Sequence, residues 1–65
     1  MALGELVSLL TGYAHARHLE LRMIPVCRPD MSHGWRVQVG NADTEAATLR
    51  GACLKAAEDL GLTED

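Results

Sequence analysis

The sequence predicts a single α+β domain, residues 1–65, with the element order α-β-β-α. Apolar residues recur at steps of three and four over residues 3–18 and 44–61, the spacing that puts side chains on one face of an α-helix. Residues 19–27 begin with alternating apolar and polar side chains, a pattern that slips at residues 24–26, and residues 35–39 alternate throughout, which is typical of a strand with one buried face. We therefore expect a two-stranded antiparallel hairpin packed against two helices.

The helix expected over residues 44–61 is the one that the other elements must cover. Its apolar stripe consists of Ala46, Leu49, Cys53, Ala56 and Leu60. Asp43 or Thr44 is expected to cap its N-terminus, because a side-chain oxygen there can accept a hydrogen bond from a free backbone N–H. Gly61 is expected to end it in a left-handed turn, which glycine adopts without strain.

The helix expected over residues 3–18 is amphipathic. Its apolar face consists of Leu3, Leu6, Val7, Leu10, Tyr13 and Ala14. Gly4 and Gly12 lower the helix propensity by about 1 kcal/mol each relative to alanine. The periodicity still predicts a helix over this range.

The two strands are expected to place their apolar side chains on a common face. The apolar positions are Leu19, Leu21, Met23, Trp35, Val37 and Val39, and the polar positions are Glu20, Arg22, Arg36 and Gln38. Pro25 cannot donate a hydrogen bond to a neighbouring strand, so the first strand is expected to lie at an edge or to bulge there. Residues 28–34 contain proline, aspartate, serine and glycine and are expected to form a loop.

The size of the chain favours self-association. A two-stranded sheet is marginally stable in water, and a chain of 65 residues hides only about 60% of its unfolded surface. A homodimer with a four-stranded sheet would enlarge the core. Because Pro25 disfavours the first strand, the second strand or the helices are the expected contact.

Composition and charge favour a globular, cytoplasmic protein that binds other proteins. Apolar residues make up 48% of the chain and charged residues 23%. The net charge is −3, with the acidic excess after residue 40, so nucleic acid is not the expected partner. Cys27 and Cys53 lack a CxxC spacing and are expected to be reduced thiols. Neither a signal peptide nor a membrane-spanning segment is expected.

No enzyme and no cofactor is predicted. The sequence has no glycine-rich nucleotide loop and no pair of acidic residues placed for general acid–base chemistry. Cys53 lies on an apolar stripe and is expected to behave as a small hydrophobic residue. Glu58 and Asp59 are adjacent, so their carboxylates do not converge on one substrate.

A metal site is an alternative that we do not favour. His15 and His18 are three residues apart near a helix end and could share a metal ion, with Cys27 or His33 as a third ligand. The spacing HxxH fits equally well two solvated histidines near a helix C-terminus, where positive charge is favourable. The favoured interpretation is the second, with no metal site.

Two surfaces are candidate partner-binding sites. The first is the polar face of the hairpin, with Glu20, Arg22, Arg36 and Gln38, and with Arg17 close by. The alternative for this face is an ordinary solvated sheet with cross-strand pairs such as Glu20 with Arg36. The second surface is the acidic end, with Glu58, Asp59, Glu64 and Asp65, which could mimic nucleic acid toward a basic partner or simply provide solubility.

Part of the sequence resembles a known family. Residues 34–39 (GWRVQV), 47–48 (AT) and 51–57 (GACLKAA) are similar to the small phage and prophage proteins described as the phage ABA sandwich domain. The resemblance implies an origin in a phage or mobile element and a layered α/β fold, and it carries over no catalytic residues. Small acidic phage proteins of this kind are similar in size to inhibitors of host defence, including anti-CRISPR proteins.

The expected function is non-catalytic binding of a protein partner in the bacterial cytoplasm, with inhibition of a host defence system as its specific form. One alternative is a nucleic-acid-binding module that uses Arg17, Arg22 and Arg36. A further alternative is a metal- or small-ligand-binding protein that uses His15, His18 and Cys27.

Overall fold

The computed structural model describes residues 2–63, which contain two helices and three strands. The elements in chain order are α1 (Leu3–Ala16), β1 (Leu21–Cys27), β2 (His33–Val39), β3 (Ala42–Ala46) and α2 (Leu49–Asp59). The α+β class is therefore confirmed. The order is α-β-β-β-α, with one strand more than the sequence predicted. Glu64 and Asp65 lie outside the described residues.

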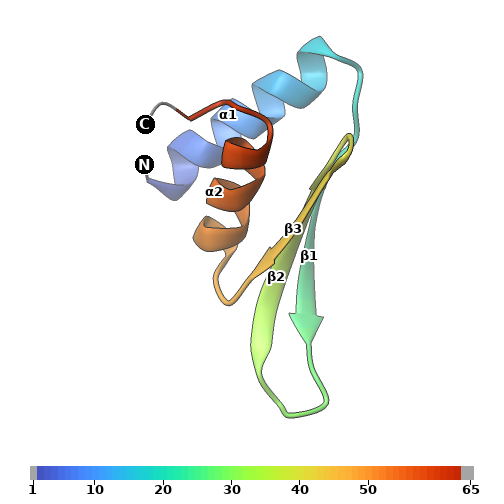
Figure 1. Cartoon of the computed structure of the whole chain (residues 1–65), viewed down its shortest axis with the longest axis vertical. Coiled ribbons are helices and arrows are strands. Elements are labelled where there is room, and N and C mark those ends of the chain that lie inside the picture. The colour runs from blue at the N-terminus through green and yellow to red at the C-terminus, as the bar shows by residue number, and fades with distance from the viewer. Residues whose placement is uncertain (1, 64–65) are drawn as a thin grey trace.

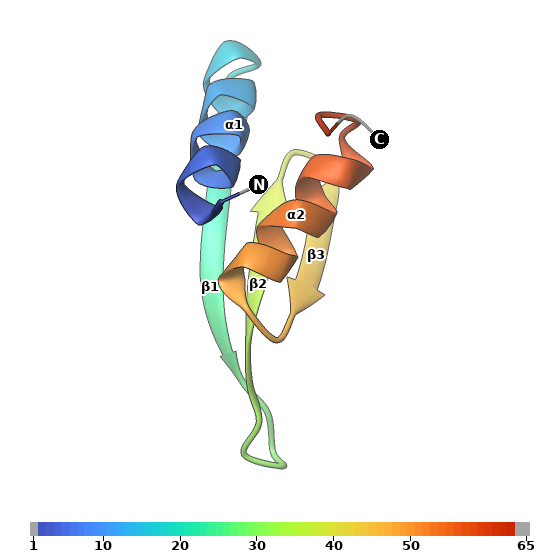
Figure 2. The ribbon, with the colours of Figure 1, turned by 90° about the vertical axis from the view of Figure 1, so that its left-hand side faces the viewer.

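The three strands form one antiparallel sheet in the order β1-β2-β3. Leu21 of β1 lies opposite Val39 of β2, which in turn lies opposite Ala42 of β3. Both helices cover the same face of this sheet, and the β1–β2 hairpin extends beyond them (Figures 1 and 2). The opposite face of the sheet is not covered by any described residue of the chain.

The predicted start of the second helix is wrong, because Ala42–Ala46 is a strand and α2 begins at Leu49. Thr48, and not Asp43 or Thr44, is the N-cap: its side-chain oxygen accepts a hydrogen bond from the Gly51 N–H at 3.0 Å. The Thr44 hydroxyl instead donates to the Ala52 carbonyl at 2.8 Å and ties β3 to α2. The sequence of residues 42–46 is compatible with either a helix or a strand, because the spacing of its two alanines fits both periods.

The predicted end of the second helix is confirmed. Gly61 has a φ of +71°, its N–H donates to the Glu58 carbonyl at 3.0 Å, and the Leu62 N–H donates to the Ala57 carbonyl at 2.8 Å. These two bonds are those of a Schellman motif, in which a left-handed residue satisfies the last free carbonyls of a helix.

Helix α1 ends in the same way, but with a histidine in the left-handed position. The Leu19 N–H donates to the Ala14 carbonyl at 2.8 Å, and His18 has a φ of +56°. A residue with a side chain is strained in this conformation by roughly 1–2 kcal/mol.

We expect the substitution His18→Gly to stabilise the protein by about 0.5–1 kcal/mol, because the relief of strain exceeds the extra chain entropy of glycine in the unfolded state. Urea denaturation followed by circular dichroism measures the change. His15→Gly, inside the same helix, is the control and should destabilise by about 1 kcal/mol. A lower midpoint for His18→Gly would mean that the imidazole makes a stabilising contact that outweighs the strain.

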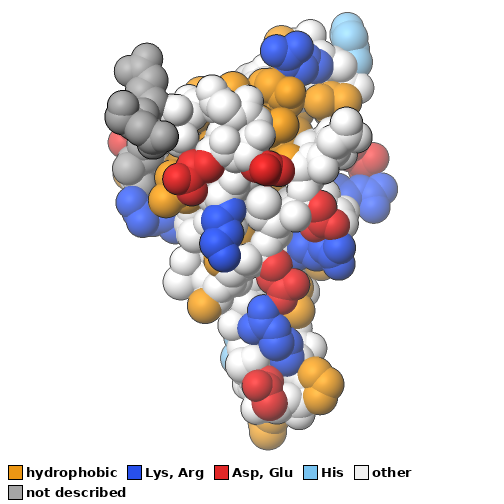
Figure 3. All heavy atoms as spheres, in the orientation of Figure 1, with side chains coloured by type: hydrophobic (Ala, Val, Ile, Leu, Met, Phe, Trp, Pro, Cys, Tyr) orange, Lys and Arg blue, Asp and Glu red, His pale blue; other side chains and the backbone are white. Residues whose placement is uncertain are grey.

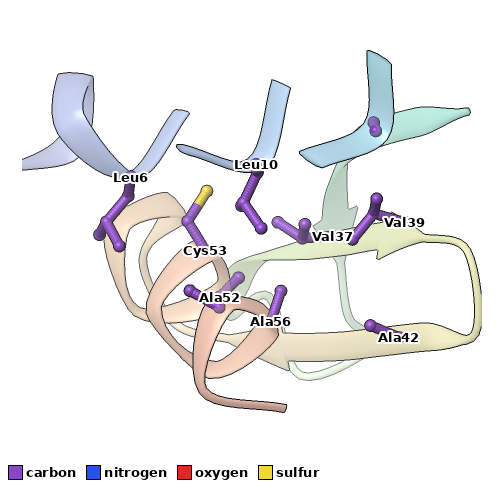
Figure 4. Packing of buried hydrophobic residues seen from close by; sticks show 10 residues of the cluster. Leu6, Leu10, Val37, Val39, Ala42, Ala52, Cys53 and Ala56 are labelled. Carbon is purple, nitrogen blue, oxygen red and sulfur yellow. The ribbon is translucent and has the colours of Figure 1, made fainter. Parts of the chain in front are cut away.

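The core lies between the helices and the sheet (Figure 4). Its buried members are Leu6, Leu10, Ala14, Val37, Val39, Ala42, Ala52, Cys53, Ala56 and Ala57. Of the predicted stripe on the second helix, Cys53 and Ala56 are buried and Leu49 and Leu60 are partly buried, whereas Ala46 belongs to β3. The small side chains on α2 let this helix lie close to the sheet.

The edges of the sheet are β1 and β3. Pro25 lies in β1, so the prediction of an edge strand from this proline is confirmed. The prediction that the second strand could form the edge-to-edge contact of a dimer is wrong. Strand β2 is the central strand and is already paired on both sides. At the β3 edge, the Lys55 ammonium donates to the Glu45 carbonyl at 3.1 Å and covers one of the free acceptors there.

Candidate binding surface

The uncovered side of the sheet, called the open face below, collects most of the polar residues that the sequence singled out. Its members are Arg22, Ile24, Val26, Gly34, Arg36, Gln38, Asp43 and Glu45, with Glu20 just ahead of β1 and Arg28 just after it. Arg22 lies opposite Gln38, and Arg36 lies between Ile24 and Glu45. The alternation of side chains along β1 and β2 therefore brings Arg22, Arg36 and Gln38 together, as expected.

The pair between Glu20 and Arg36, named above as an example of cross-strand pairs on a solvated sheet face, does not form. Arg36 donates through Nε to Asp43 Oδ1 at 2.8 Å and through Nη2 to Asp43 Oδ2 at 2.5 Å. Glu20 instead accepts from Nε of Arg22 at 2.9 Å. The sequence does not predict strand β3. Because β3 lies beside β2, the Asp43 carboxylate is within hydrogen-bond distance of Arg36.

A third pair crosses the whole sheet. Arg28 follows β1, and its guanidinium reaches the Glu45 carboxylate on β3 and also lies 3.5 Å from the Ser32 hydroxyl. It passes over Gly34 of β2, where an added Cβ would lie 3.5 Å from the guanidinium nitrogens and 2.9 Å from the Ala46 carbonyl oxygen. The absence of a side chain at Gly34 thus avoids a clash with the Ala46 carbonyl oxygen, whereas the guanidinium would be in ordinary van der Waals contact with an added Cβ.

The three arginines of the open face are each held by a carboxylate, so this face carries no excess of positive charge. Figure 3 shows acidic and basic side chains interspersed over the visible surface and along the hairpin. Such an arrangement attracts polyanions weakly, because a phosphate must compete with a carboxylate for each guanidinium. Between the pairs lie Ile24, whose exposed fraction is 38%, and the half-buried Val26.

The Arg36–Asp43 pair gives a pH-dependent contribution to stability. The hydrogen bond from Arg36 lowers the pKa of the Asp43 carboxyl below its ordinary value. A carboxyl whose pKa is lower in the folded state stabilises the fold above the unfolded value of about 3.9, and this contribution is lost as the pH falls through the folded pKa.

We therefore expect Asp43→Asn to be slightly less stable than the natural protein at pH 7, with the difference shrinking as the pH falls below the ordinary carboxyl pKa and through the lowered pKa of Asp43. The effect is small because the pair is exposed to solvent. Urea denaturation of both proteins at pH 7 and at pH 2.5 is the measurement. A difference that persists unchanged at the lower pH would contradict a contribution from the ionised pair.

The other predicted residues lie elsewhere. Arg17 belongs to the end of α1, where its guanidinium stacks at 4.6 Å from the centroid of the Tyr13 ring. It lies in the helical layer, so it does not join Arg22 and Arg36. Glu58 and Asp59 are exposed on the last turn of α2, also in that layer. Glu58 and Asp59 therefore lie on a different surface from the open face, and Glu64 and Asp65, the other members of the acidic end, lie outside the described residues.

The histidines and cysteines do not form a complete metal site. His15 lies on α1 and His18 beyond its end, while Cys27 lies at the far end of β1. Within residues 2–63 there is no group of three or more His, Cys, Asp and Glu side chains that could hold a metal ion. Cys53 is buried, and burial raises the pKa of its thiol.

The turn between β1 and β2 is ordered by its own hydrogen bonds. Asp30 Oδ1 accepts from the Ser32 N–H at 3.0 Å and from the Ser32 hydroxyl at 2.7 Å. The Met31 N–H donates to the Arg28 carbonyl at 2.9 Å. Met31 itself is left-handed, with a φ of +67°, and its side chain is 82% exposed. The sequence indicated a loop here, but not that a large apolar side chain would stand at its tip.

The part of the chain that the structure describes has no pocket, and none of its helices is long and apolar enough to cross a membrane. Comparison of the chain with protein-family models, with curated proteins and with solved structures gives no match.

Proposed function

We propose that this protein acts by binding another protein, without catalysis, through the open face of its sheet. The observation that supports this is Ile24, an exposed apolar side chain at the middle of an uncovered sheet face, with three arginine–carboxylate pairs around it. Protein interfaces commonly have an apolar centre with a polar rim, and arginine is enriched in them.

The ion pairs favour binding in a second way. Each guanidinium is already held in one orientation, so less side-chain entropy is lost when a partner covers the face. The described part of the chain has no pocket, so this face offers no concave site. A pre-ordered surface without a pocket suits a folded protein partner better than a small ligand, for which a concave site is usual.

The partner and the cellular setting rest on the resemblance to phage proteins. On this resemblance we propose the cytoplasm of a bacterial host as the setting, and inhibition of a host defence complex, as by anti-CRISPR proteins, as the specific form of binding. The homodimer expected from the size of the chain remains part of the proposal. It would leave the open face accessible if the contact lies on the helices or the hairpin tip.

The test is capture from a nuclease-treated bacterial lysate with the tagged protein and two variants. We expect the natural protein to retain a stoichiometric protein partner. Ile24→Asp should weaken this capture by more than about tenfold, the effect expected at the centre of an interface. Leu3→Asp is the matched control, because Leu3 on α1 is also 38% exposed, and it should capture the partner as the natural protein does.

Circular dichroism of each variant must show an intact fold, with Ile24→Thr as the milder substitution if the aspartate disturbs β1. Equal capture by Ile24→Asp and the natural protein would contradict the open face as the binding surface. Recovery that disappears with nuclease, and that falls steeply with salt in its absence, would instead make nucleic acid the ligand.

A further inference from the structure

Cys27 and His33 form a cross-strand pair at the outer end of the β1–β2 hairpin. They are direct partners in the register of the two strands. In the next pair outward, the Arg28 N–H donates to the Ser32 carbonyl at 3.0 Å. Hydrogen-bonded and non-hydrogen-bonded pairs alternate along an antiparallel ladder, so Cys27 and His33 form a non-hydrogen-bonded pair, the kind in which side chains approach closest.

Both side chains are free to bind a ligand. Cys27 is an exposed free thiol and His33 is exposed. Among the interactions of residues 2–63, no side-chain hydrogen bond or ion pair is found at either residue. They lie on the side of the sheet away from the open face, at the end of the hairpin that projects past the helices (Figures 1 and 2).

Hydrogen bonds and an ion pair hold the end of the hairpin that carries Cys27 and His33. The turn beyond it is closed by the Asp30–Ser32 hydrogen bonds, and Arg28 fastens this end of β1 to Glu45 on β3. The guanidinium of Arg28 is directed to the open face, so its positive charge is turned away from the thiol and the imidazole. The Cβ atoms of directly opposite residues are about 4.5–5.5 Å apart, which allows both side chains to bind one metal ion.

We propose that Cys27 and His33 are half of a Zn²⁺ site that a second copy of the chain completes. Thiolate sulfur and imidazole nitrogen are the usual ligands of structural zinc, at about 2.3 Å and 2.0–2.1 Å, and such sites are tetrahedral with four ligands. The described part of the chain offers no third ligand beside the pair. Two hairpin tips related by a two-fold axis supply two sulfurs and two nitrogens, and the two thiolates balance the charge of the ion.

This site explains how the chain can dimerise although its sheet edges are obstructed. Neither Pro25 in β1 nor Lys55 at β3 is disturbed when two hairpin tips meet. The inference is independent of the proposed partner-binding function, because the metal lies on the opposite side of the sheet from Ile24.

The test is titration of the reduced full chain with Co²⁺, whose tetrahedral thiolate complexes absorb in the visible and near ultraviolet. We expect saturation at one Co²⁺ for two chains, and a doubled mass in sedimentation when Co²⁺ or Zn²⁺ is present. Cys27→Ser and His33→Ala should each weaken Co²⁺ binding by more than about 100-fold, since even outer partners of metal ligands contribute 10–100-fold. Cys53→Ala and His15→Ala are the controls and should bind Co²⁺ as the natural protein does.

The reducing agent excludes a disulfide between two Cys27 residues as the cause of a dimer. Three results would overturn the proposal: a thiolate absorption that survives in Cys27→Ser, saturation at one Co²⁺ per chain without a change in mass, or an unchanged spectrum at a twofold excess of Co²⁺. Because Cys27 and His33 are exposed, their variants are expected to fold, and circular dichroism confirms this in the same samples.

Discussion

Replacement of Leu10 by alanine is expected to unfold most of the protein at 25 °C. Leu10 is fully buried between α1, α2 and the sheet, and it is one of the few large side chains in a core made mainly of alanine and valine (Figure 4). Truncation of a buried leucine destabilises by about 2–5 kcal/mol. A single core in a chain of this size rarely supplies more than about 3–5 kcal/mol in total.

Circular dichroism at 25 °C and thermal unfolding measure this effect. Leu3→Ala in the same helix is the control, because Leu3 is 38% exposed and its truncation should change stability by less than about 0.5 kcal/mol. If Leu10→Ala melted at the temperature of the natural protein, Leu10 would not be the core residue that the structure places between the layers.

Replacement of Gly34 by alanine is expected to destabilise the protein by about 1–3 kcal/mol, the usual range for a group forced into a filled space. The added methyl group would lie 2.9 Å from the backbone oxygen of Ala46, so β2 and β3 would have to move apart. The guanidinium of Arg28 would lie at 3.5 Å, an ordinary van der Waals contact, so the expected effect comes from the Ala46 oxygen.

The matched control is Gly12→Ala in α1, where an added Cβ meets no atom within 4 Å. The same chemical change should there stabilise the protein by about 0.5–1 kcal/mol, because alanine is the better helix former. Urea denaturation of the two variants should thus shift the midpoint in opposite directions. A shift of the same sign in both would mean that the sheet accommodates the methyl group at Gly34.

The elements with a strong period could be predicted from the sequence, and β3 could not. In α1 and β2 large apolar residues mark a single period, so the type of element and its buried face follow directly, whereas in β1 the alternation slips at Ile24 and only its first residues indicate the buried face. Residues 42–46 contain alanine at both ends and no large apolar side chain, and alanine is compatible with either period. The turn at Gly40, with a φ of +57°, starts a second hairpin, so residues 42–46 form a strand and not the beginning of a helix.

The residues of the open face could likewise be predicted only in part from the sequence. Alternation along β1 and β2 was enough to place Arg22, Arg36 and Gln38 on one face. The sequence predicts Asp43 as a possible helix cap, and the pairing of Asp43 and Glu45 with arginines depends on the register of a strand that the sequence does not reveal. Arg28 lies in the predicted loop, but its ion pair with Glu45 spans seventeen residues of sequence and depends on the same register.

The hydrogen bond from the Lys55 ammonium to the Glu45 carbonyl makes one helix responsible for protecting both a face and an edge of the sheet. Helix α2 both covers the apolar face of the sheet and supplies the charge that guards its β3 edge. Detachment of α2 alone would therefore expose the apolar face of the sheet and the unpaired backbone groups of the β3 edge at the same time. We expect any association through the β3 edge to depend on the free energy of opening of that single helix, rather than on the free energy of unfolding the whole molecule.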